Sequence, residues 1–398
     1  MRALHAAKGT FTADAATPSQ PVDGLGFAPR AVIAWWTRQE REGVASGNRG
    51  GLAFWAAGTG TAAVAWASDD GASPTRTTRL ADSAAFLGLE HASVQEPAKA
   101  RIASFDQDGF TLSWDTRPEA TWIVHYLALG GPAVTGARVG WLTPNVSLEA
   151  ARRDLVLFTP APPELRAPSS PLSIGIGAAA GRRQAAAGYL SRNGTDAGEV
   201  AGAQRDDAAI VVVRDTTAPA TVGRTVRRGL RDVALRWSSA GPEAERVAYL
   251  ALEGVRCKVG VEVSPPSPAT KATDGIGFRP DALLFFSWGL HAKRETTDIG
   301  RLCIGGATSP AAAGCAGWDD RDVDARPSTT HVCSSTSDVL IVTNTQTGGI
   351  HAAAALASID RDGFTLDWTS SDGLQREFAY VALAARDRSG LGRLLPRV

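Results

Sequence analysis

The sequence lacks net charge, long apolar runs and any large supply of cysteine. Its 398 residues include 41 Lys and Arg against 41 Asp and Glu, so no overall electrostatic field draws it to nucleic acid or to an anionic membrane. No run reaches the roughly 18 apolar residues of a membrane-spanning helix, and the first 20 residues lack the apolar segment of a signal peptide. We therefore expect a protein that binds neither nucleic acid nor membrane and carries no secretion signal.

The four cysteines do not have the spacing of a scaffold or a metal site. Cys257, Cys303, Cys315 and Cys333 are separated by 46, 12 and 18 residues. This is neither a disulfide-dense pattern nor the close pairing of zinc ligands. The spacing favours free thiols, and one bridge among the four is the alternative.

Common catalytic and metal-binding patterns are missing as well. No histidine is followed by glutamate, which excludes the HExxH zinc-protease pattern, and no Gly-Lys pair is present to form a phosphate-binding loop. Asp106 and Asp108, and likewise Asp360 and Asp362, begin like a calcium loop, but no glutamate follows at the twelfth position. We predict ordinary turns there, no metal, no cofactor and no enzyme activity.

An internal repeat organises the sequence. Hydrophobic residues make up 44% of the chain and charged residues 21%, a composition that can bury more than one core. Residues 103–114 read ASFDQDGFTLSW and residues 357–368 read ASIDRDGFTLDW, identical at nine of twelve positions. Upstream, residues 23–29 read DGLGFAP and residues 274–280 read DGIGFRP, identical at five of seven. The chain therefore contains at least two copies of one module.

A third, more divergent copy lies between these two. In each copy a tryptophan is followed twelve residues later by a tyrosine that opens a closing apolar run. The pairs are Trp114 with Tyr126, Trp237 with Tyr249, and Trp368 with Tyr380. The middle copy has Asp232 where the outer copies have Gly109 and Gly363, so its turn has changed.

The repeat predicts three domains of about 125 residues, in line with usual domain sizes. We place a first repeat at 1–131, a degenerate second repeat at 132–254, a third repeat at 255–385 and a C-terminal tail at 386–398.

Each copy has the pattern of an all-β module. Phe110, Leu112 and Trp114 alternate with polar residues, which is typical of a strand with one buried face. Asp108-Gly109 before this strand predicts a hairpin turn with positive φ. Short helices are expected only at 148–153 and 178–187. Frequent turns between short strands predict three tandem β-sandwich or jelly-roll-like repeats. The predicted core residues are Phe110, Leu112, Trp114, Tyr126, Val233, Leu235, Trp237, Tyr249, Phe364, Leu366, Trp368 and Tyr380.

The remaining aromatic residues offer the main candidates for ligand binding. Trp55, Trp66 and Trp318 fall outside the repeated motifs and would stack on sugar rings if they were exposed. Packing inside the protein is the alternative. His125 is expected to be a packed histidine, because the other copies have alanine at its position.

The stretches DGLGFAPRAVIAWW, SFDQDGFTLSW and VHYLALGG together resemble a repeat of virion structural proteins in tailed bacteriophages and prophages. The resemblance covers the first and third copies well and the second only at its ends. It implies a non-enzymatic component of a capsid or tail, such as a decoration protein, a fibre or an adhesin, and it supplies no catalytic residues. Other virion proteins and further copies of the chain are the implied partners, and the virion, assembled in the host cytoplasm, is the implied location.

Two other functions remain open from the sequence. One is a carbohydrate-binding adhesin that recognises host-surface glycans through loop aromatics. The other is a β-sandwich glycan hydrolase, which needs two carboxylates at a fixed separation. No acidic pair in the sequence stands out from the turn residues.

Overall fold

The computed structural model describes residues 3–13, 17–93, 97–142, 154–161, 166–167, 172–195, 199–214, 221–228, 232–238, 246–289, 296–297, 299–321 and 328–386. Every regular element in these ranges is a β-strand, and neighbouring strands run antiparallel. This confirms the all-β prediction. Within the same ranges there is no helix with the length and apolarity needed to cross a membrane.

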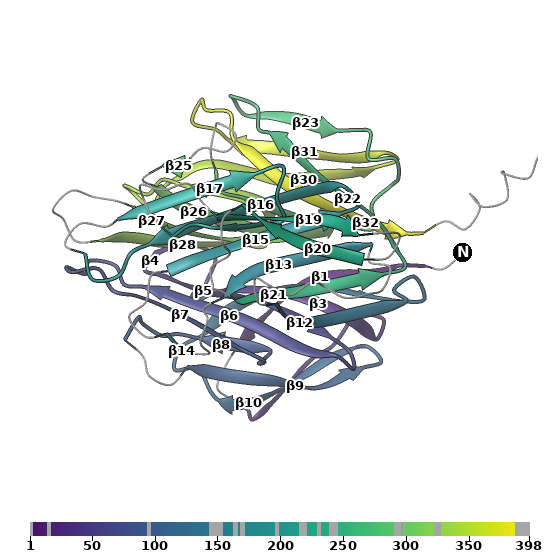
Figure 1. Ribbon diagram of the computed structural model, residues 1–398, viewed down its shortest axis with the longest axis horizontal. Coiled ribbons are helices and arrows are strands. Elements are labelled where there is room, and N and C mark those ends of the chain that lie inside the picture. The colour runs from purple at the N-terminus through teal and green to yellow at the C-terminus, as the bar shows by residue number, and fades with distance from the viewer. Residues whose placement is uncertain are drawn as a thin grey trace, which may run out of the picture.

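The first unit runs from β1 to β11 (Figure 1). Its strands are β1 (His5–Ala13), β2 (Ser19–Val22), β3 (Pro29–Thr37), β4 (Gly43–Ser46), β5 (Asn48–Ala56), β6 (Gly60–Ser68), β7 (Thr77–Asp82), β8 (Phe86–Gly88), β9 (Ala98–Asp106), β10 (Gly109–Thr116) and β11 (Trp122–Gly130). One sheet has the order β1-β11-β3-β5-β6-β7, and a smaller sheet has the order β2-β10-β9-β8. An apolar cluster fills the space between the two sheets.

The second unit runs from β12 to β21. Its strands are β12 (Gly136–Leu142), β13 (Leu155–Ala161), β14 (Arg166–Ala167), β15 (Leu172–Ala180), β16 (Arg183–Ser191), β17 (Val200–Arg205), β18 (Ile210–Val212), β19 (Thr221–Arg228), β20 (Asp232–Trp237) and β21 (Arg246–Glu253). The larger sheet has the order β12-β21-β13-β15-β16-β17, and the smaller has the order β18-β19-β20. The larger sheet therefore repeats the order of the first unit.

The third unit runs from β22 to β32. Its strands are β22 (Val255–Val263), β23 (Ala269–Thr273), β24 (Ala282–Ser287), β25 (Thr296–Thr297), β26 (Ile299–Ser309), β27 (Ala312–Arg321), β28 (Thr329–Ser335), β29 (Asp338–Thr343), β30 (Ile350–Asp360), β31 (Gly363–Ser370) and β32 (Glu377–Ala385). The orders β22-β32-β24-β26-β27-β28 and β23-β31-β30-β29 match both sheets of the first unit.

Each larger sheet is extended to seven strands by a short strand from another unit. β14 pairs with β7, β25 pairs with β17, and β4 pairs with β28. The second unit thus donates to the first, the third to the second, and the first to the third. Because the donation runs in one direction around the molecule, it closes the three units into a ring.

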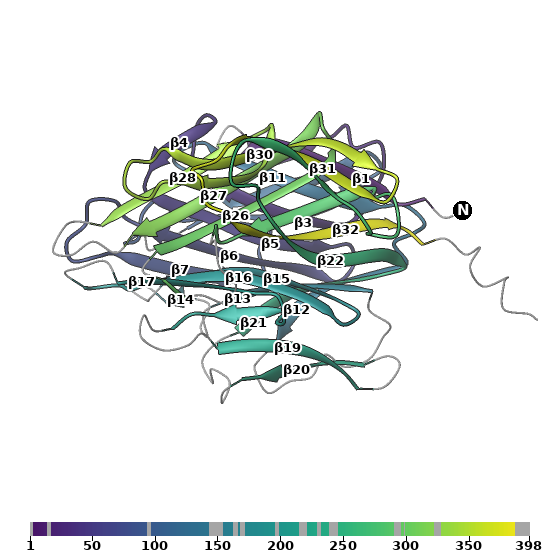
Figure 2. The same ribbon diagram turned by 90° about the horizontal axis from the view of Figure 1, so that it is seen from above.

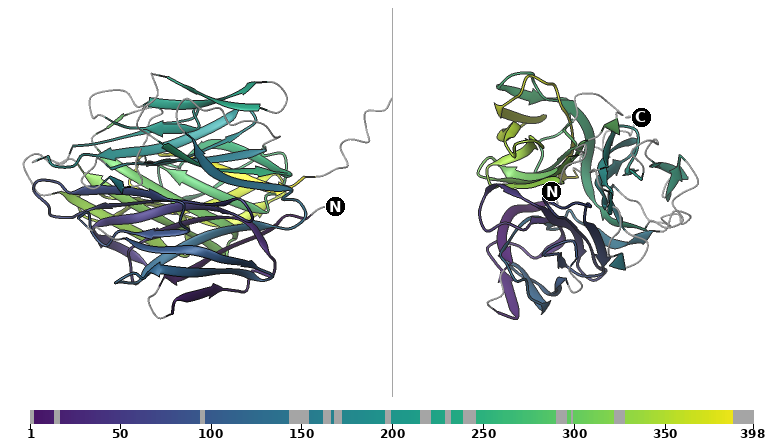
Figure 3. Two further views of the ribbon diagram at one scale, coloured as in Figure 1. Left: turned by 60° about the horizontal axis from the view of Figure 1, so that its bottom comes forward. Right: turned by 90° about the vertical axis from the view of Figure 1, so that its left-hand side faces the viewer.

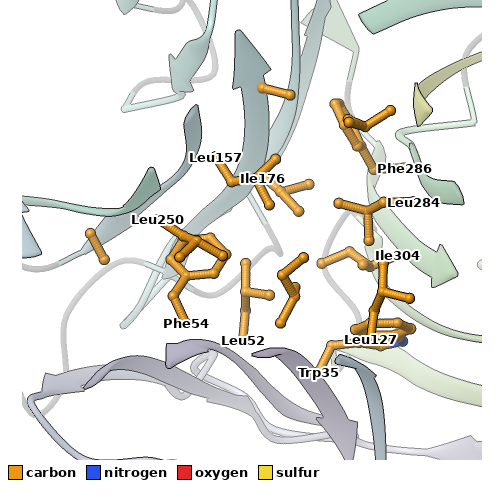
Figure 4. Close-up of a cluster of buried hydrophobic side chains, with 14 of the residues drawn as sticks. Trp35, Leu52, Phe54, Leu127, Leu157, Ile176, Leu250, Leu284, Phe286 and Ile304 are labelled. Carbon is orange, nitrogen blue, oxygen red and sulfur yellow. The ribbon is translucent and has the colours of Figure 1, made fainter. Parts of the chain in front are cut away.

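The three seven-stranded sheets enclose one apolar core (Figure 3). The end-on view shows the three units arranged around a common centre. Leu52, Ile176 and Ile304 occupy corresponding positions on β5, β15 and β26 and belong to a single buried cluster. Figure 4 shows these side chains converging from the three units. Burial of apolar area at this centre is therefore shared by all three units.

Neighbouring units meet where the first strand of one unit packs on the larger sheet of another. β12 packs on β5 and β6, in what we call the 1–2 seam, and β22 packs on β15 and β16, in the 2–3 seam (Figure 2). β1 packs on β26 and β27, in the 1–3 seam, which also contains β4 and β28. Short peptide links run directly from β11 to β12 and from β21 to β22. The 1–3 seam joins the two ends of the chain and has no such link.

The two repeated motifs, DGLGFAP and SFDQDGFTLSW in the first unit, contact each other in the structure. Gly24 and Gly26 have φ of 86° and 76°, which favours glycine, and both backbone N–H groups donate to the carboxylate of Asp108. In the third unit the N–H of Gly277 donates to Asp362 in the same way. The aspartate of one motif thus holds the turn of the other motif.

Two expectations about local structure were wrong. The segment 178–187 forms the hairpin of β15 and β16 and is not helical; it turns at Gly181, whose φ is 63°. Gly109 is not among the glycines with positive φ. Glycine is needed there because a Cβ would lie 1.9 Å from the backbone oxygen of Val22 on the neighbouring strand. The other expected helix, 148–153, lies outside the described residues.

Candidate functional site

The tryptophans that the sequence offered to a sugar are buried. Trp55, Trp66 and Trp318 are each 1% exposed. Trp55 Nε1 donates to the backbone oxygen of Ala85 at 2.9 Å, and the rings of Trp66 and Trp318 meet edge to face with centroids 5.0 Å apart. None of the three presents a ring face to solvent, so their role is packing and not sugar stacking.

The predicted core positions lie mostly inside the units. Leu235 and Trp237 of the second unit are partly buried, and the side chain of Val233 lies outside the described residues. The buried members are Phe110, Leu112, Trp114, Tyr126, Tyr249, Phe364, Leu366, Trp368 and Tyr380.

The four cysteines are free thiols. Burial raises the pKa of Cys257 to about 12 and that of Cys333 to about 12. Burial also raises the pKa of Cys315, with a further contribution from neighbouring Cys303. Because the thiolate is the reactive form, these side chains act as small apolar residues near neutral pH. Across the described ranges, no group of three or more His, Cys, Asp or Glu side chains is placed to hold a metal ion.

One polar cluster joins all three units at the ring centre. Asn48 of the first unit donates through Nδ2 to the hydroxyl of Tyr189 in the second and, at 3.1 Å, to Oδ2 of Asp320 in the third. Burial raises the pKa of Asp320 well above its usual range, and the adjacent Asp319 acts in the same direction. Burial likewise raises the pKa of Tyr189. The centre therefore favours neutral side chains.

A second polar cluster lies in the 1–3 seam. The ammonium of Lys8 on β1 lies 3.3 Å from Nδ1 of His125 on β11, and Nε2 of His125 lies 2.9 Å from Oγ of Ser334 on β28. The imidazole stacks on Trp35 with centroids 5.8 Å apart. Burial lowers the pKa of Lys8 to about 8. Burial, followed by the charge of Lys8, lowers the pKa of His125 well below its usual range.

The other two seams have largely apolar side chains at these positions. The strand registers place Val139, Ala248 and Ala81 at the corresponding points of the 1–2 seam. In the 2–3 seam the corresponding residues are Val259, Ala379 and Gln204. All six are buried. The sequence marked His125 as unusual because its counterparts are alanine, but it gave no sign of Lys8 or Ser334.

A polar groove of about 420 Å³ borders the donated strand β4. All four residues of β4 line the groove. Successive side chains of a strand point to opposite faces of the sheet, so four consecutive residues can line the groove only if it runs along the free edge of β4. Arg38 pairs with Glu90, and Arg49 lies 3.6 Å from Asp69. Arg41 is exposed and has no ionic or hydrogen-bond partner among the described residues. The groove is large enough for a short peptide or an oligosaccharide.

Comparison with protein-family models, with curated proteins and with solved structures finds no match to the chain.

Proposed function

We propose that this chain is a non-enzymatic structural protein of a tailed bacteriophage or phage-like particle, a decoration or fibre component of the capsid or tail that acts through protein–protein assembly. In this proposal the three units are copies of one jelly-roll-like β-sandwich repeat of about 125 residues, with a degenerate second copy. The recurrence of one strand order in the three larger sheets supports this reading.

The observation that carries the proposal is the cyclic donation of β14, β25 and β4. It makes a closed ring from one chain, with three units that face outward in three directions (Figure 3). Several weak contacts from one rigid body add up to strong attachment on a surface that repeats its binding sites. The ring is therefore better suited to multivalent attachment on a symmetric particle than to catalysis at a single active site.

The buried polar groups are consistent with a structural role. Asn48, Tyr189 and Asp320 bind one another, and Lys8, His125 and Ser334 form their own network. All six lie between units and none lines the groove beside β4. Other virion proteins, and further copies of this chain, are the partners that the proposal requires.

The proposal is tested on particles from the source strain. Particles are purified by density gradient after prophage induction, and their proteins are quantified by mass spectrometry. We expect the chain at a fixed ratio to the major capsid or tail protein, and deletion of its coding sequence should leave particles without this component. Particles that form normally and never contain the chain would rule the proposal out.

The groove beside β4 favours carbohydrate binding as a second candidate function. Its lining combines Arg41, which has no partner among the described residues, with the exposed Glu40, whereas the Gln39 amide is already hydrogen-bonded to Thr37 and Gly43. Planar polar side chains of this kind hydrogen-bond to sugar hydroxyls. A glycan array with the wild-type protein and with Arg41→Ala tests it. Binding of a defined glycan that Arg41→Ala abolishes supports this function, while Trp55→Ala in the protein core serves as a control for indirect effects.

A further inference from the structure

We propose that the 1–3 seam is an acid-sensitive closure of the ring, which is shut at neutral pH and opens when His125 takes up a proton beside Lys8. The inference concerns how the ring closes and does not depend on the proposed function. It rests on the position of the seam in the chain, on the hydrogen bonds of His125, and on the contrast with the other two seams.

The 1–3 seam is the one that the covalent structure leaves free to part. β11 ends at Gly130 and β12 begins at Gly136, while β21 ends at Glu253 and β22 begins at Val255. These short links keep the 1–2 and 2–3 seams together even if their side chains separate. Units one and three have no link between them, so separation there converts the ring into an open array of three units.

The chemistry of the network determines the protonation state of His125. A lysine ammonium has only donors, so Nδ1 of His125 must accept from Lys8 at 3.3 Å. The neutral ring then carries its proton on Nε2 and donates to Ser334 Oγ at 2.9 Å. When a solvent proton binds Nδ1, the lone pair that accepted from Lys8 is consumed. Two positively charged donors of the first unit then face each other and the Lys8 hydrogen bond is lost. Because both groups are buried against the third unit, parting of the seam lets water reach the two charges.

The direction of the pH effect follows from the shifted pKa values. The pKa of His125 in the closed ring lies well below 6.5, so below pH 6.5 the open form binds more protons than the closed form. Stability of the closed seam is therefore present above pH 6.5 and is lost as pH falls below it. Lys8 has its pKa lowered from 10.5 to about 8, so its effect is complete by neutral pH and does not change in the acid range.

Other groups also face the network. Cys315 faces Lys8 as a neutral thiol, because burial raises its pKa. Glu42 also faces Lys8, and its carboxylate accepts from the Thr336 hydroxyl across the same seam at 2.6 Å. Trp35 covers the other face of His125. Glu42 therefore contacts the same seam and needs its own control. His331 on β28 pairs with β4, and its hydrogen bond to Asp319, with the charge of Asp70 in the first unit, raises its pKa above 6.5, so its contribution is complete below pH 6.5 and constant in the acid range.

Hydrogen exchange followed by mass spectrometry tests the proposal on the full chain. Rates are measured from pH 7 to pH 5 and corrected for the pH dependence of intrinsic exchange. We expect exchange in β1, β4 and β28 to rise by up to about tenfold per pH unit below pH 6, the limit for uptake of one proton. β12 and β22, the corresponding strands of the linked seams, should keep their protection.

Three variants separate His125 from other causes. Combined Lys8→Val, His125→Ala and Ser334→Ala reproduces the residue types of the 1–2 seam and should remove the acid response. His125→Gln, which retains volume and polarity without a titrating ring, should do the same if the triple variant folds poorly. Glu42→Gln should leave the response below pH 6 in place. An unchanged acid response in His125→Gln, or an equal response of β12 in the wild type, would overturn the proposal.

Discussion

The seam between units one and three is held differently from the seam between units one and two. In the 1–2 seam a peptide link joins β11 directly to β12, and Val139, Ala248 and Ala81 pack as apolar side chains. In the 1–3 seam no link exists, and Lys8, His125 and Ser334 take the corresponding places. At these three positions, the seam without a peptide link is thus the one with a buried polar network, although units one and two share polar contacts elsewhere, such as Thr77 N–H to Asn193 Oδ1.

This difference has a physical reason. A buried lysine and histidine stabilise a contact less than valine and alanine would, because both lose hydration. They do distinguish the correct partner from the incorrect ones, since Lys8 and His125 both belong to the first unit and only the third unit supplies the Ser334 hydroxyl to the buried imidazole. The polar network therefore makes closure specific but lowers the stability of the closed seam. Because the buried His125 can take up a proton, the same network makes the seam sensitive to pH.

Trp35→Ala should break the 1–3 seam most severely. Trp35 is fully buried, stacks on His125 and packs on Gly306, where an added Cβ would lie 2.9 Å from the indole. We expect a loss of about 3–5 kcal/mol in unfolding free energy, measured by urea denaturation. A loss below about 1 kcal/mol would show that the seam contributes little to the fold.

Val139→Lys places a lysine in the 1–2 seam at the point that corresponds to Lys8. Ala248 there offers no acceptor, so we expect a loss of roughly 2–3 kcal/mol at neutral pH. The control is Val259→Lys in the 2–3 seam, where the Gln204 oxygen already accepts from the Trp288 N–H, so a similar loss is expected. If either variant is as stable as the wild type, the lack of a partner is not what distinguishes the seams.

Asp320→Asn should stabilise the polar cluster at the ring centre. Because burial raises the pKa of Asp320, the folded protein loses stability as pH rises above 3.8, where the unfolded chain releases its proton more readily. Asparagine removes that penalty, and we expect a gain on the order of 1 kcal/mol at pH 7 with a flatter pH profile. Thermal unfolding at pH 4 and pH 7 measures both. An equal gain at both pH values would contradict the assignment.

Asp108→Ala should have the smallest of these effects. It removes the acceptor of the Gly24 and Gly26 N–H groups, and we expect a loss of about 1 kcal/mol because both turns are exposed to water. Asp362→Ala in the third unit should match it. Thermal unfolding of the two variants gives the comparison, and a large loss from one alone would mean that the two turns differ in function.

The sequence predicted the regular parts of the fold better than the contacts between its units. Alternation in Phe110, Leu112 and Trp114 identified a strand, since one buried face imposes a period of two on any sequence. The role of Asp108 was not predictable, because its hydrogen-bond donors lie 82 and 84 residues away. The tryptophans were ambiguous for a similar reason: the burial of Trp66 depends on Trp318 of another unit.

The residues of the 1–3 seam also show that contacts between distant parts of the chain could not be predicted from the sequence. His125 departs from the alanines at its corresponding positions, and that departure was visible in the repeat. The partners of His125 could not be identified from the repeat, since Lys8 lies 117 residues away and Ser334 lies 209 residues away. Strand donation by β4 was also invisible, because four residues carry too short a pattern to indicate which sheet they join.

An NMR titration of the His125 imidazole nitrogens measures whether the 1–3 seam closes around a neutral histidine. Selective ¹⁵N labelling with a His125→Gln spectrum for assignment isolates its signal among the six histidines. We predict a neutral ring with its proton on Nε2 at pH 7 and a titration midpoint well below 6.5, accompanied by loss of the closed seam. A midpoint at or above 6.5, with the seam still closed around a protonated ring, would contradict the account.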